Sequence, residues 1–144
     1  MLLFNRNTRL LTVLSVVVLT SCIATGETSK LSEDANTRKV LSQLSNDAEN
    51  AFEYSKAAEY YSRILELQPK NIKATLGLAR NLRYAGMPKE AIKIIKDHVS
   101  KFNKVESLRV ELLKSQLAAG MLEIALETAI QLKTENPSNW ELYS

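Results

Sequence analysis

The 144-residue sequence contains very few of the residues that build disulfides, metal sites and phosphate-binding loops. Cys22 is the single cysteine and His98 the single histidine, so an internal disulfide is impossible and the usual zinc ligand sets cannot form. The four glycines are scattered and make no phosphate-binding loop. We therefore expect no metal site and no cofactor.

The sequence also has little excess of charge of either sign. The chain has 19 basic and 16 acidic residues, and removing Arg6 and Arg9 in the N-terminal segment leaves 17 against 16, a net charge near +1. Nucleic-acid binding needs several cations gathered on one face of a protein. The charge balance therefore does not favour nucleic acid as a partner.

Groups for catalysis are missing as well. His98 has no cysteine or serine motif to pair with, and catalysis needs a constellation of groups rather than a lone one. A packed or partly exposed histidine is the more common reading of such a residue. The sequence predicts no catalytic residue and no small-molecule substrate, so the protein is expected not to be an enzyme.

Residues 1–21 have the three parts of an export signal. Arg6 and Arg9 give a basic start, an apolar run extends from Leu10 to Leu19, and small polar residues precede Cys22. The apolar run is shorter than the ~20 residues that a helix needs to cross a bilayer. These features predict a cleaved signal peptide rather than a membrane-spanning anchor.

The quartet Leu19-Thr20-Ser21-Cys22 resembles the lipobox of bacterial lipoproteins. The resemblance implies that Cys22 is lipidated, with acyl chains such as palmitate, and becomes the first mature residue. An ordinary signal peptide with a chance cysteine is the alternative. Ile23 stands where an Asp typically retains such proteins in the inner membrane, which implies the periplasmic face of the outer membrane. Residues 22–36 mix small and charged residues, as in a flexible tether spanning ~20 Å.

A period of 34 residues organises the sequence from residue 37 onward. Apolar residues recur at three- and four-residue spacing without any strand signal, which predicts an all-α fold. Three sets of equivalent positions are Ala57, Ala91 and Ala125, then Leu44, Leu78 and Leu112, then Tyr61, Ile95 and Ala129. Thirty-four residues is the length of the tetratricopeptide repeat.

The residues also resemble that family. The segment from Ala57 to Asn71 is similar to the second helix and closing turn of a tetratricopeptide repeat, and Gly86 and Pro88 stand where one helix ends and the next begins. The resemblance implies a solenoid of antiparallel helix pairs over 37–144. Its repeats would be 38–71, 72–105 and 106–139, with the start of a fourth at 140–144.

Three positions depart from the family pattern. Phe52 stands where the first repeat should have its helix-ending glycine, and Leu113 and Gln116 replace a small and an apolar residue in the third. No capping helix follows the start of the fourth repeat at 140–144. Either the sequence continues further or a partner covers the last open face.

In tetratricopeptide proteins the first helix of each pair lines a concave groove that accepts peptides or helices. The middle of this groove combines cations with apolar side chains, which suits an acidic or amphipathic protein segment. A solvated charged face is the alternative. Carried onto this sequence, the groove residues are Lys73, Leu76, Arg80, Arg83, Tyr84, Lys114 and Leu117.

A lipobox, a short tether and repeats containing the segment from Leu78 to Gly86 resemble the repeat-bearing lipoproteins of tight-adherence (Flp) pilus assembly. The resemblance implies a membrane-anchored periplasmic scaffold that helps to assemble the outer-membrane secretin or another pilus component. The alternatives are a type IV pilus pilotin or a tetratricopeptide lipoprotein that recruits a hydrolase. An enzyme would need catalytic residues in a further domain.

Overall fold

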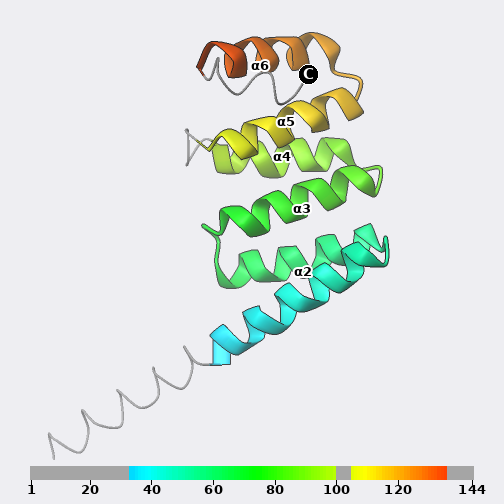
Figure 1. The fold of residues 1–144 in the computed structure, drawn as a ribbon, viewed down its shortest axis with the longest axis vertical. Helices are drawn as coiled ribbons and strands as arrows, with labels where there is room; N and C mark the ends of the chain where they lie inside the picture. Colours follow the sequence, from blue (N-terminus) through cyan, green and yellow to red (C-terminus); the bar gives the residue numbers. More distant parts are fainter. Residues whose placement is uncertain (1–32, 100–104, 136–144) are drawn as a thin grey trace, which may run out of the picture. The chain divides into compact units, whose positions relative to one another are not determined.

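The computed structural model describes residues 33–99 and 105–135, and these residues form helices joined by short turns. The predicted signal peptide, most of the tether, Cys22 and the start of the fourth repeat lie outside the described residues. Within them the all-α prediction is confirmed. The helices are the first helix at residues 33–50, then α2 (Tyr54–Leu67), α3 (Ile72–Tyr84), α4 (Pro88–Val99), α5 (Glu106–Ala118) and α6 (Leu122–Glu135) (Figure 1).

From residue 38 the chain forms one compact unit in which each helix from α2 onward packs against the next, and α3 also packs against α5. Figure 1 shows the helices following one another along the stack in chain order. The contact between α3 and α5 joins the first helices of the second and third pairs. This arrangement is the solenoid of helix pairs that the 34-residue period predicts.

The turns inside the pairs share one backbone feature. Gly86 and Gly120, which are 34 residues apart, have φ angles of 79° and 73°, the left-handed region that follows a helix end. Phe52 occupies the same register in the first pair and has a φ of 58° although it is not glycine. Its backbone is therefore strained, at the position where the sequence departs from the glycine of the family pattern.

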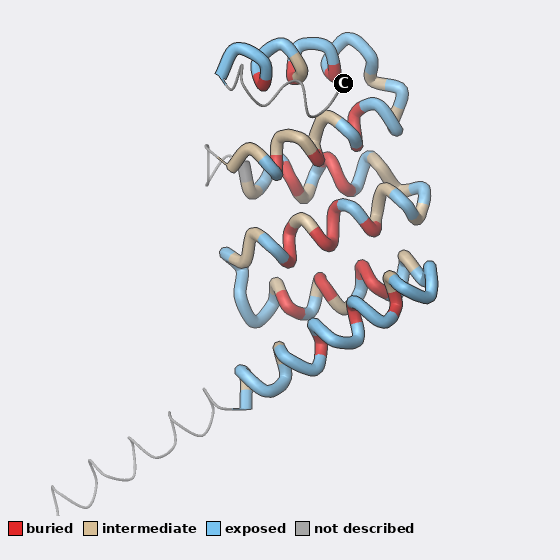
Figure 2. The backbone as a smooth tube through the Cα atoms, in the orientation of Figure 1, coloured by how far each residue is buried: buried red, intermediate tan, exposed pale blue. Residues whose placement is uncertain are grey.

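The core lies between the helices, as Figure 2 shows by its buried positions. One apolar cluster joins α2 to α3 and includes Tyr61 and Leu78, and another joins α3, α4 and the start of α5. Four small residues allow this close packing, because their side chains are fully buried. They are Ala57, Ala79, Ala91 and Ala125.

Polar residues replace part of the core in the third pair. Ser115 and Gln116 are both buried in α5, and Gln116 Oε1 has no hydrogen-bond partner among the described residues. Leu113 is only half-buried. Buried polar residues also occur in the first two pairs, at Ser45, Thr75 and Asn81, and Asn81 Oδ1 likewise has no hydrogen-bond partner among the described residues.

The start of the first helix differs from the sequence prediction. Residues 33–36, assigned above to the flexible tether, are helical. No glycine or proline interrupts residues 33–50, and the Thr37 hydroxyl donates a hydrogen bond to the Glu33 carbonyl at 2.9 Å. The polar composition of these residues suggested a coil because it has no apolar period, but it contains nothing that breaks a helix.

His98 has a structural position near the end of α4. Its ring nitrogens lie 3.2 Å from the Ile94 carbonyl oxygen and 3.0 Å from that of Pro69. The second contact connects α4 to the turn between α2 and α3. This is the packed position that the sequence favoured over a catalytic one.

Candidate protein-binding groove

Three of the predicted groove cations are exposed on the first helices of the second and third pairs. Lys73 and Arg80 lie on α3, and Lys114 lies on α5, which packs against α3. Within residues 33–99 and 105–135, none of the three forms an ion pair. Their charges are therefore available to an anionic group of a partner.

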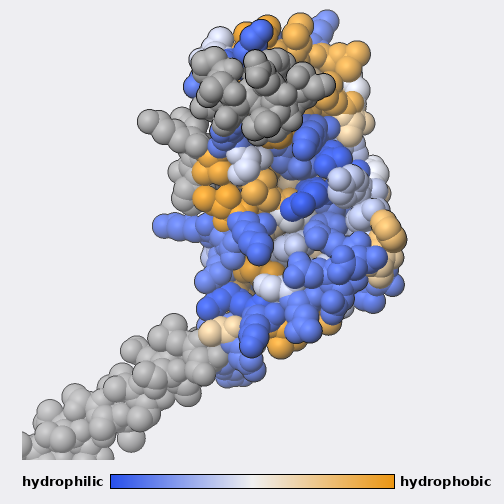
Figure 3. All heavy atoms as spheres, viewed as in Figure 1, coloured by the Kyte–Doolittle hydropathy of each residue, from blue (hydrophilic) through white to orange (hydrophobic). Residues whose placement is uncertain are grey.

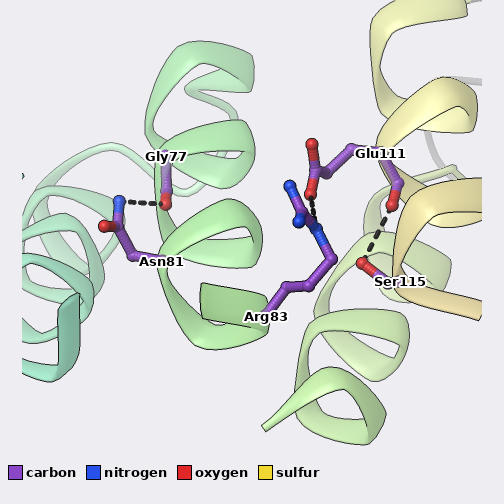
Figure 4. A network of polar contacts seen from close by, with 5 residues as sticks. All are labelled: Gly77, Asn81, Arg83, Glu111 and Ser115. Carbon is purple, nitrogen blue, oxygen red and sulfur yellow. Dashed lines mark hydrogen bonds and ion pairs between the residues drawn. The ribbon is translucent and has the colours of Figure 1, made fainter. Parts of the chain in front are cut away.

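Arg83, the fourth predicted cation, is already occupied by a contact within the protein. Its Nε donates a hydrogen bond of 2.8 Å to Glu111 Oε1, which ties α3 to α5, and both side chains are largely buried (Figure 4). Burial acts to lower the pKa of Arg83, but contacts with Glu111 and Tyr84 outweigh it and leave the pKa raised. Arg83 thus joins two repeats and is not a free cation of the groove.

The backbone of Glu111 accepts a further hydrogen bond within its own helix. The Ser115 hydroxyl donates a hydrogen bond of 2.8 Å to the backbone carbonyl of Glu111, as Figure 4 shows. Glu111 was not among the predicted groove residues. Its spacing of 28 residues from Arg83 falls outside the 34-residue register, so comparing equivalent positions does not reveal the pair.

An aromatic row lies beside Arg83. The Arg83 guanidinium lies 4.4 Å from the centre of the Tyr84 ring, and that ring lies 5.0 Å from the ring of Tyr54 on α2. Phe52 contacts Tyr54 edge-on, with 6.2 Å between ring centres. Tyr84 and Phe52 remain 52% and 75% exposed, so the row offers apolar surface to a partner.

The sequence predicted Tyr84 but missed Phe52 and Tyr54. A signal for Phe52 was present, because an aromatic residue at a glycine position is unusual. A bulky residue held at positive φ costs stability and is often retained for a function. The row of three rings depends on packing between α2 and α3, which the sequence does not show.

Lys73 also lies beside the first helix. A small hollow there is lined by Ser42, Asn46 and Lys73, together with the buried Tyr61. Burial raises the pKa of Tyr61, and the nearby Glu49 carboxylate raises it further. Polar side chains and the buried ring of Tyr61 thus line this hollow together.

The two predicted apolar residues of the groove differ in exposure. Leu76 is half-buried because it packs against the cluster that joins α3, α4 and α5. Leu117, near the end of α5, is 52% exposed. Leu117 can contact a partner directly, whereas Leu76 mainly packs against the core.

Among the described residues no group of three or more His, Cys, Asp or Glu side chains could hold a metal ion. In the same part of the chain, no helix combines the length and the apolar character needed to cross a membrane. The described surface offers cations beside half-exposed aromatic and aliphatic side chains. Such a surface can bind a protein segment that carries both acidic and apolar groups.

Comparison with known proteins agrees with this geometry. A family model described as tetratricopeptide repeat matches residues 45–117, just over half of the chain. The chain belongs to the tetratricopeptide-repeat family. Tetratricopeptide repeats are protein-interaction modules and are typically non-catalytic, so this chain is a protein-interaction scaffold with a protein partner. No curated protein matches the sequence.

Proposed function

We propose that the protein is a lipid-anchored scaffold whose groove binds an acidic, amphipathic protein segment. The observation that carries the proposal is the placement of exposed Arg80 and Lys114 on the packed helices α3 and α5, with the half-exposed Tyr84 also on α3. Cations flanking an aromatic anchor give a partner both charge recognition and buried apolar contact. Tyr84 is held against Tyr54 and Arg83, so little side-chain entropy is lost on binding.

The system that best fits this architecture is tight-adherence pilus assembly at the outer membrane. A lipobox, a tether and tetratricopeptide repeats resemble TadD, the repeat lipoprotein of that system. The partner would then be the outer-membrane secretin or another pilus component. Support comes from the combination of the segment around Cys22 with a protein-binding groove.

The groove is tested by combining Arg80→Glu with Tyr84→Ala. Arg80 and Tyr84 are exposed, so the variant should fold, yet it reverses one recognition charge and removes the aromatic anchor. We expect secretin multimers and displayed pili to fall at least tenfold in cells, since losing both contacts should exceed ~1.4 kcal/mol. Arg83 is not mutated because reversing its charge would place two carboxylates together at Glu111.

The matched control is Arg63→Glu, which reverses an exposed charge on α2, outside the groove helices. Circular dichroism of both variants checks their helix content. Normal secretin assembly by a folded Arg80→Glu, Tyr84→Ala protein would contradict the groove. Equal loss in both variants would point to net charge instead.

Anchoring is tested separately at Cys22. The variant Cys22→Ser should lose all labelling by a palmitate analogue, because the acyl chains need the cysteine sulfur. It should also move from the membrane fraction to the soluble fraction, since two or three chains at ~0.8 kcal/mol per buried CH₂ account for stable anchoring. A variant that stays labelled, or stays on the membrane, would reject lipidation at this residue.

A further inference from the structure

The two ends of the helix stack present open faces that are equivalent to faces buried inside it. At the first helix, Val40 is 50% exposed, whereas the equivalent residues Ala74 and Leu108 are 2% and 0% exposed. Leu44 is exposed as well, whereas its equivalent Leu78 is buried. Inside the stack these positions pack against the second helix of the preceding pair.

The last described helix shows the complementary feature. Leu126 on α6 is 62% exposed, whereas the equivalent Ala58 and Ile92 are 4% and 7% exposed. Leu122 and Ile130, one turn to either side, are exposed too, and Figure 3 shows hydrophobic atoms gathered at this end of the stack. Since α6 also buries Ala125 on its inner face, it is apolar on two faces, as expected of a helix covered on both.

The internal interfaces show which residues would meet. Tyr61 and Ala74 belong to one cluster, and Ile95 and Leu108 belong to the other. Tyr61 and Ile95 are equivalent positions in the second helices of two successive pairs, and Ala74 and Leu108 are equivalent positions in the first helices that follow them. Each cluster thus joins these two positions across the boundary between one pair and the next. At the open ends these two positions are Ala129 and Val40. Their side chains are smaller than the internal pairs, so they would meet without overpacking.

Charge does not distinguish the two end helices. The first helix, residues 33–50, carries Arg38 and Lys39 together with four acidic residues, Glu33, Asp34, Asp47 and Glu49. Helix α6 carries three glutamates and one lysine. Both helices thus carry more acidic than basic residues, so the matching apolar positions, and not charge, favour the association of these two faces.

We infer that the chain self-associates head to tail, with the first helix of one copy covering α6 of the next and continuing the stack. Among the described residues the first helix is the element with the matching open face. Such an interface joins two different surfaces, so it builds a ring or an open chain rather than a closed dimer. The groove lined by the first helices would then extend across copies.

Disulfide trapping in intact cells tests the inference with the full-length protein. Copies carrying both Val40→Cys and Ala129→Cys should form linked dimers and higher multiples after oxidation. Figure 1 places the first helix and α6 at opposite ends of the stack, so the bond must join two copies. Copies that carry only Val40→Cys should form this link only when copies that carry only Ala129→Cys, marked with a different tag, are expressed in the same cells.

The matched control replaces Ala129→Cys by Ile124→Cys on the same helix. Ile124 is exposed, and so are its equivalents Lys56 and Glu90, so this position faces away from the proposed interface. Adding Leu126→Glu should reduce the Val40–Ala129 linkage at least tenfold, whereas Ile124→Glu should leave it unchanged. The unsubstituted chain shows the background from Cys22.

Three results would overturn the inference. The first is no linkage between Val40→Cys and Ala129→Cys, as expected if residues of the same chain beyond 135 or another protein cover α6. The second is linkage of equal yield with Ile124→Cys, which indicates random collision. The third is linkage that Leu126→Glu does not change. If self-association is not found, the groove proposal still stands, because it is tested separately by measuring secretin assembly with the Arg80→Glu, Tyr84→Ala variant.

Discussion

Replacing Gly77 with Ala is expected to destabilise the protein, although the same change in most helices is stabilising. A Cβ atom at this position of α3 would lie 2.5 Å from two atoms of the Tyr61 ring, far inside van der Waals contact. Tyr61 is buried against α3 and cannot move away freely. The overpacking should cost up to ~3 kcal/mol, whereas the higher helix propensity of alanine over glycine should contribute ~1 kcal/mol of stability. The free energy of unfolding should therefore fall by about 2 kcal/mol, measured by urea denaturation of the purified protein.

The control for this prediction is the same change in a Tyr61→Leu background. Leucine removes the ring atoms that a Cβ at Gly77 would meet, so Gly77→Ala should then be neutral or stabilising. Tyr61→Leu will itself lower stability, and the comparison is made within that background. An equal loss in both backgrounds would show that the ring is not the cause.

Replacing Leu108 with Ala should have the largest effect on stability. Leu108 is fully buried on α5 and packs with Ala91 and Ile95, so its side chain joins the second helix pair to the third. Truncation removes apolar burial and leaves a cavity, which together typically cost 2–5 kcal/mol. In a small protein this is a large part of the total stability.

Leu117→Ala is the matched control, because it makes the same change on the same helix at a residue that is 52% exposed. We expect it to change the free energy of unfolding by about 0.5 kcal/mol or less. Thermal unfolding followed by circular dichroism compares the two. Similar losses would mean that α5 is not held to the second pair through Leu108.

The sequence was sufficient to predict the fold, because residues with the same packing role recur at a fixed spacing from one repeat to the next. Ala57, Ala91 and Ala125 are fully buried as their spacing required, and Gly86 and Gly120 have the backbone angles expected after a helix. The helix start at residues 33–36 was missed because polar residues without a period can be coil or helix. Helix propensity alone is a weak guide to whether such residues form a coil or a helix.

The groove was predicted only in part. Register placed Arg80, Tyr84 and Lys114 on the first helices, where they are exposed. It could not show that Arg83 turns toward Glu111, because that contact depends on how α3 and α5 cross. Nor could it show that Tyr84 stacks on Tyr54 of the preceding helix. Contacts between helices depend on three-dimensional packing, which a one-dimensional period does not specify.

The buried pair of Arg83 and Glu111 has a consequence for how a partner must bind. Apolar clusters tolerate small sliding motions, but separating this guanidinium from its carboxylate would leave two charges unpaired and poorly hydrated. The pair therefore opposes rotation between the second and third helix pairs. A segment that is already helical would dock onto this preset curvature at little cost in entropy, whereas a disordered segment would bear the whole cost of ordering itself.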